Sequence, residues 1–82
     1  MSVLKDPILN RPIREAVLER IASGEIAWVD LSPGRDQRRT VNVKRKLGVV
    51  PQNRGAMTDR IEYEEAVRIT RAAGLDPVDV GL

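Results

Sequence analysis

The 82-residue sequence predicts a small single α+β domain in which two helices pack on one face of a short antiparallel β-hairpin. Two stretches with apolar residues at helical spacing, 10–24 and 58–74, flank a middle stretch, 25–50, in which apolar and polar residues alternate. Helical spacing is typical of amphipathic helices, and alternation is typical of half-buried strands. The expected order is therefore helix, strand, strand, helix, with an extended arm (1–9) before it and a short apolar tail (75–82) after it.

The first helix is expected within residues 10–24. Asn10 is a suitable N-cap, Pro12 fits the first turn, where its missing N–H costs nothing, and Gly24 is typical of the residue that ends a helix. The apolar side chains that share one face are Ile13, Ala16, Val17, Leu18 and Ile21. We expect this face to pack against the hairpin.

The hairpin is expected from two runs of alternating side chains, 25–31 and 40–47, separated by a break at 32–34 and a polar, basic loop. The break has the sequence Ser-Pro-Gly, which is typical of turns. Val41 and Val43 are β-branched and favour a strand, and Trp28 is expected in the core. Alternation would place Lys44 and Lys46 on the same exposed face of the second strand.

The second helix is expected within residues 58–74. Asp59 as N-cap, with Glu62 three residues later, forms a pattern that resembles a capping box, and Thr58 is the alternative cap. Gly74 fits the C-terminal end, and Leu75 fits the hydrophobic contact that accompanies such an end.

A competing interpretation concerns residues 40–57. The pattern T-x-x-V-x-x-x-L-G-V at 40–49 resembles the centre of a helix-turn-helix motif, in which two helices meet at a tight glycine turn. Three residues depart from that pattern. Lys44 stands where a small residue is usual, Arg54 stands where the second helix needs an apolar one, and Gly55 would lie inside that helix. Both interpretations stay open at this point.

Positive charge is concentrated in the middle of the chain. Residues 31–56 contain seven basic side chains and one acid, Asp36, a local net charge of +6. Residues 1–30 have a net charge of −1 and residues 57–82 a net charge of −3, so the whole chain has a net charge of only +2. A basic segment between two mildly acidic flanks predicts a surface for an anionic polymer.

The first functional hypothesis is non-enzymatic DNA binding, regulatory or architectural, through a winged-helix-like hairpin or a helix-turn-helix-like pair. Arginine and lysine would contact phosphates without reading sequence, whereas glutamine, asparagine and arginine can also read base edges. Six side chains are expected to contact phosphates: Arg35, Arg38, Arg39, Lys44, Lys46 and Arg54. Gln52 and Asn53 are the candidate base readers.

Several chemistries lack the residues they need. The chain has no cysteine and no histidine, so disulfides, thiolate ligands, thiol nucleophiles and imidazole bases are excluded. Glu62 and Glu65 lie three residues apart, but nothing in the sequence supplies the partners of a catalytic carboxylate pair. We therefore expect no enzymatic activity, no metal and no cofactor.

The second functional hypothesis is a protein-interaction module that binds an acidic protein surface. Small, arginine-rich, phenylalanine-free domains of this kind are plausible as bacteriophage or actinobacterial accessory proteins. With only Trp28 and Tyr63 as aromatic residues, the core is small, and a homo-oligomer would hide apolar surface. The absence of cysteine and of any long apolar run leads us to expect a cytoplasmic protein without a membrane segment.

Overall fold

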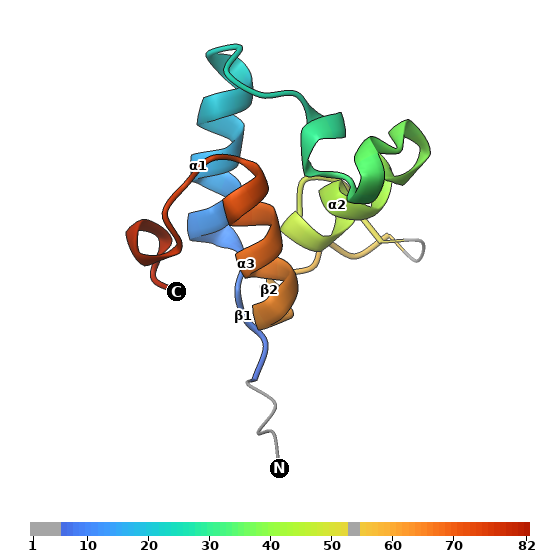
Figure 1. The fold of residues 1–82 in the computed structure, drawn as a ribbon. Helices are drawn as coiled ribbons and strands as arrows, with labels where there is room; N and C mark the ends of the chain where they lie inside the picture. Colours follow the sequence, from blue (N-terminus) through green and yellow to red (C-terminus); the bar gives the residue numbers. More distant parts are fainter. Residues whose placement is uncertain (1–5, 53–54) are drawn as a thin grey trace.

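Three α-helices and one two-stranded antiparallel sheet make up the fold, which a computed structural model describes for residues 6–52 and 55–82 (Figure 1). The helices are α1 (Arg11–Ala22), α2 (Thr40–Leu47) and α3 (Tyr63–Ala72), and the strands are β1 (Ile8–Leu9) and β2 (Arg60–Ile61). Four 3₁₀ turns connect them: η1 (Trp28–Leu31), η2 (Pro33–Arg35), η3 (Gln37–Arg39) and η4 (Pro77–Val80).

The sheet joins two segments that are far apart in the chain. Ile8 pairs with Ile61 and Leu9 with Arg60, and the backbone N–H of Asn10 continues the pairing with a hydrogen bond of 3.1 Å to the Asp59 carbonyl oxygen. A small α+β domain with an antiparallel strand pair is thus confirmed. The position of that pair differs from the prediction, because both strands lie outside residues 25–50.

The expected β-hairpin at 25–50 is wrong. The second run, 40–47, is the helix α2, in which Val43 and Leu47 are buried while Val41 is 39% exposed. Burial at positions i and i+4 follows the helical period and not the strand period. The first run ends in η1, because the Asp30 carboxylate accepts a hydrogen bond of 2.9 Å from the Ala27 backbone N–H and turns the chain back.

The helix-turn-helix interpretation is correct only for its first half. Gly48 ends α2 in the left-handed conformation (φ 76°), as a tight glycine turn requires. No second helix follows within the described part of residues 49–59. Instead the Gln52 backbone N–H donates to the Ala56 carbonyl oxygen at 2.8 Å, which closes a loop beside α2 (Figure 1).

The two outer helices are confirmed, with changes at their starts. Asn10 precedes α1, but its side chain makes no capping hydrogen bond. The second helix, α3, begins at Tyr63 with Glu62 as N-cap, so the expected cap at Asp59 is wrong. The reason is that Arg60 and Ile61 pair with β1 and cannot also join the helix.

The core lies where the three helices meet under the sheet. Its buried apolar side chains come from every α-helix, from η1 and from β2: Ile13, Val17, Leu31, Val43, Leu47, Ile61, Ala66, Ile69 and Ala73. Trp28 packs against this cluster and is half-buried, which fits the expectation of a core residue. The tail folds back through η4, and Leu75, Val80 and Leu82 pack on the same cluster. Small helical domains of this kind depend on such burial for most of their stability.

Candidate nucleic-acid interface

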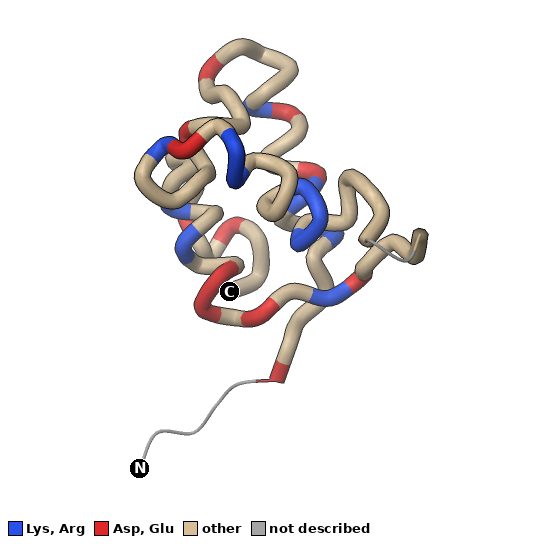
Figure 2. Tube along the Cα trace, turned by 90° about the vertical axis from the view of Figure 1, so that its right-hand side faces the viewer, with Lys and Arg blue, Asp and Glu red and all other residues tan. Residues whose placement is uncertain are grey.

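Five of the eight predicted binding residues, Arg35, Arg38, Arg39, Lys44 and Lys46, lie on the segment that runs from η2 to α2. The Asp36 side chain starts η3 by accepting a hydrogen bond of 2.9 Å from the Arg38 backbone N–H, and Thr40 follows directly as the first residue of α2. This local capping sets Arg38 and Arg39 on a rigid turn and not on a hairpin tip. Figure 2, which faces the α2 side of the molecule, shows Lys and Arg positions interspersed with Asp and Glu positions along the trace.

Five cations share three carboxylates on this side of the molecule. The Arg35 guanidinium pairs with Asp30 at 3.1 Å, and Arg38 and Arg39 both pair with Asp36, at 3.5 and 3.6 Å. The remaining two cations, Lys46 and Arg68, both pair with Glu65. We call these five residues (Arg35, Arg38, Arg39, Lys46 and Arg68) the basic surface. Because two of the carboxylates each serve two cations, the surface keeps a surplus of positive charge.

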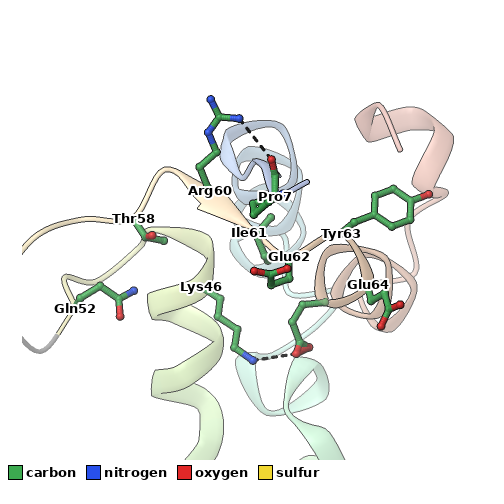
Figure 3. Close-up of a pocket in the computed structure, with 10 residues that line it drawn as sticks. Pro7, Lys46, Gln52, Thr58, Arg60, Ile61, Glu62, Tyr63 and Glu64 are labelled. Atoms are coloured by element: carbon green, nitrogen blue, oxygen red, sulfur yellow. Dashed lines mark hydrogen bonds and ion pairs between the residues drawn. The ribbon is translucent and has the colours of Figure 1, made fainter. Parts of the chain in front are cut away.

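Glu65 joins α2 to α3. Its carboxylate accepts a hydrogen bond of 2.9 Å from Lys46 Nζ and another from Arg68 Nε, and the Lys46 contact is drawn in Figure 3. Partial burial raises the pKa of Glu65, but the hydrogen bonds and positive charges of Lys46 and Arg68 outweigh it, so the pKa lies below its usual value. Arg68 also donates to the Leu31 carbonyl oxygen at 2.9 Å, which fixes its side chain.

Lys46 lines two hollows of the surface. The smaller, about 330 Å³, is lined by Pro33, Arg39, Asn42, Val43, Lys46 and Arg68. Three of its six lining residues are cations and none is an acid, so we call it the cationic hollow. The larger hollow, about 730 Å³, is bordered by β2 and the start of α3 and includes Glu62 and Glu64 (Figure 3). Lys46 therefore belongs both to a positive hollow and to a mixed one, and Glu65 lines only the mixed one.

The structure brings together only part of the predicted set. Arg39 and Lys46 line one hollow, and Arg35 and Arg38 stand on the adjoining turns, with 74% and 91% of their side chains exposed. Lys44 does not belong with them. On a helix, positions two apart point to nearly opposite sides, so the expected shared face of Lys44 and Lys46 is wrong. The Lys44 ammonium instead lies over the Trp28 ring, 5.3 Å from its centroid.

The candidate base readers receive little support from the structure. Gln52 Nε2 donates to the Arg45 carbonyl oxygen at 3.1 Å, so part of its amide is used to fasten the loop to α2. Asn53 and Arg54 lie outside the described residues. The part of the interface that can be described is therefore suited to phosphate contacts and not to base readout.

Sequence reasoning missed Arg68 and Asn42. Arg68 belongs to α3, far from the basic segment in the chain, and only its position three residues after Glu65 pointed to an ion pair. Asn42 became visible once α2 was a helix, because Arg39, Asn42 and Lys46 then follow the spacing i, i+3, i+7 of a single helical face.

Two further features were sought in residues 6–52 and 55–82: a metal-ligand cluster and a membrane-spanning helix. No three acidic side chains in these ranges come close enough to hold a metal ion. None of their helices combines the length and apolar character needed to cross a membrane. Comparison with protein-family models, with curated proteins and with solved structures found no match.

Proposed function

We propose that this protein binds DNA without catalysing a reaction, by contacts between its basic surface and the phosphate backbone. The observation that carries the proposal is the sharing of carboxylates: five cations face three acids, so charge remains for a polyanion. Exposed ion pairs contribute only about 0–1 kcal/mol each, and a phosphate oxygen competes with such carboxylates on similar terms.

The backbone of Arg35 adds support. It is the only non-glycine residue with a positive φ in the described ranges, at 56°, and this conformation costs a side-chain-bearing residue about 1–2 kcal/mol. Its side chain is 74% exposed and makes an ion pair with Asp30. A strained residue with an exposed cationic head is typical of a position kept for binding and not for packing.

Through the proposed contacts the protein would bind DNA with little dependence on the base sequence. Phosphate contacts fix position and orientation, whereas specificity comes from base edges or DNA shape. Such a surface fits an architectural role, or a regulatory role in which a partner protein supplies the specificity. It fits less well with recognition of a DNA sequence by Gln52.

Salt dependence tests the proposal. Binding to a labelled random-sequence duplex is measured by fluorescence anisotropy at several salt concentrations. The logarithm of the binding constant should fall with the logarithm of salt with a slope of about 0.9 per phosphate contacted. Absence of binding at low salt would refute the proposal.

A matched pair of charge reversals locates the contact. Arg38→Glu should weaken binding and lower the salt slope by about 1, because it removes one phosphate contact. Arg11→Glu is the control, since Arg11 is also an exposed arginine, 75% exposed, that pairs with a nearby acid, Glu15, but lies on α1 outside the basic surface. Equal losses in the two variants would show that only net charge matters.

An acidic protein surface is the second candidate partner. The observation that favours it is Glu65 itself, because a carboxylate already occupies Lys46 and Arg68. This candidate takes precedence if the wild-type protein fails to bind duplex DNA at low salt. Arg38→Glu would then be expected to impair binding of the acidic partner.

A further inference from the structure

We propose that the cationic hollow is a seat for one phosphate group and that Glu65 is a built-in competitor for that seat. This inference rests on the proposed function and deepens it, because it names where a single phosphate binds and what limits its affinity. The hollow is lined by Arg39 of η3, Asn42 and Lys46 of α2 and Arg68 of α3, with Pro33 and Val43.

The donors of the hollow suit a phosphate. Arg39 and Arg68 provide guanidinium N–H groups, Lys46 provides an ammonium, and Asn42 provides an amide N–H. They come from η3, α2 and α3, so donors from three elements can contact the oxygens of one tetrahedral phosphate. Pro33 and Val43 complete the wall with apolar atoms, which lower the local dielectric constant and strengthen the charge contacts.

One nitrogen of the Arg68 guanidinium has no hydrogen-bond acceptor among the described residues. Its Nε contacts Glu65 and its Nη1 contacts the Leu31 carbonyl oxygen, but its Nη2 is buried and has no hydrogen-bond partner among the described residues. A buried donor without an acceptor is unfavourable. Two contacts therefore hold the side chain in place at the edge of the hollow, and the buried Nη2 has no acceptor among the described residues.

Glu65 already forms ion pairs with two of the cations that a phosphate would contact. Its carboxylate contacts both Lys46 and Arg68, and only 23% of its side chain is exposed. A phosphate entering the hollow must share these two cations with Glu65 or replace it. Removing the Glu65 charge should therefore strengthen phosphate binding even though it removes two favourable contacts from the folded protein.

A pair of neutral substitutions tests the seat. Asn42→Ala should weaken binding to duplex DNA about three- to tenfold, the effect of one hydrogen bond, without changing net charge. Asn42 is exposed on α2, so alanine should leave folding intact. Gln37→Ala is the matched control, because Gln37 is another exposed amide and lies outside the hollow. Equal affinities of the two variants would overturn the seat.

A pair of glutamate substitutions tests the competitor. Glu65→Gln and Glu64→Gln remove the same charge one residue apart, so long-range electrostatics change equally. Glu64 points away from Lys46 in Figure 3 and makes no ion pair within the described ranges. Glu65→Gln should raise affinity for duplex DNA at least threefold more than Glu64→Gln. Equal effects would refute the role of Glu65.

A third measurement separates this inference from the proposed function. Inorganic phosphate is titrated into the wild-type protein while the Asn42 side-chain amide is followed by NMR. Saturable shifts of the Asn42 amide, with no shift of the control Gln37 amide, support the seat even if duplex DNA does not bind. In that case the ligand would be a free or terminal phosphate. No shift together with equal Asn42 and Gln37 variants rejects the seat while leaving backbone binding by the wider surface standing.

Discussion

Asn10 and Thr58, 48 positions apart in the chain, are joined by a hydrogen bond of 2.8 Å from Asn10 Nδ2 to the Thr58 carbonyl oxygen. The same nitrogen donates to the Lys46 carbonyl oxygen at 3.1 Å, and the Asn10 Oδ1 atom accepts from Arg14. Asn10 is only 1% exposed. One side chain therefore ties the start of α1 to the end of α2 and to the segment that leads into β2.

Replacing Asn10 should destabilise the whole domain. Asn10→Ala leaves two partly buried carbonyl oxygens without their donor, so we expect a loss of about 2–4 kcal/mol in the free energy of unfolding. Chemical denaturation measures this value. Asn42→Ala, an exposed asparagine on α2, is the control and should change stability by less than about 0.5 kcal/mol. A small effect at Asn10 would show that the two carbonyls find other donors.

Gly48 lies against the same junction. Its φ of 76° is left-handed, and a Cβ atom there would lie 2.5 Å from the Thr58 carbonyl oxygen and 2.7 Å from Arg14 Nη1. Gly48→Ala should therefore cost about 1–2 kcal/mol for the backbone and roughly 1–3 kcal/mol more for the forced shift of α2. Gly24→Ala isolates the backbone cost, since Gly24 has a φ of 80° but no atom within 4 Å of its Cβ position. Equal unfolding free energies for both variants would contradict the close approach.

The sequence predicted the outer helices better than the middle of the chain, and residues 40–47 show why. Their β-branched valines and their alternation favour a strand, but the burial of Val43 and Leu47 in the core follows a helical period. Tertiary contacts outweigh local preference in a segment this short. Two helix signals were present in the sequence: Gly48 after the last apolar residue and three basic residues in the last turn.

The candidate site was predictable in composition but not in geometry. The sequence identified Arg35, Arg38, Arg39 and Lys46 from their charge. It could not place Arg68 beside them, because Arg68 reaches Lys46 only through Glu65, and the Lys46–Glu65 pair joins residues 19 positions apart in the chain. The strand β2 was hidden for the same reason, since a two-residue pairing with β1 leaves no pattern in the chain.

Stability should depend on pH through Glu65. Its pKa in the folded protein lies below the usual value of about 4.5, so the folded state favours the ionised form. The resulting stabilisation is present above pH 4.5 and is lost as the pH falls through the lower, folded pKa. At pH 7 the wild-type protein should therefore be more stable than Glu65→Gln in thermal unfolding, and the difference should shrink as the pH falls below 4.5. A difference that does not change with pH would remove Glu65 as the source.

Replacing Arg35 should change the affinity for DNA without lowering the stability of the fold. Arg35→Gly relieves the left-handed backbone, which is worth about 1 kcal/mol, and loses an exposed ion pair with Asp30 worth about 0–1 kcal/mol. The free energy of unfolding should therefore stay constant or rise slightly. Affinity for duplex DNA should fall and the salt slope should decrease by about 1, because one cation leaves the basic surface. Arg35→Lys, which keeps the charge and the strain, should retain most of the affinity. A clear loss of stability in Arg35→Gly would show instead that the Arg35–Asp30 pair maintains the fold of η2, and the strained backbone would then have a structural explanation.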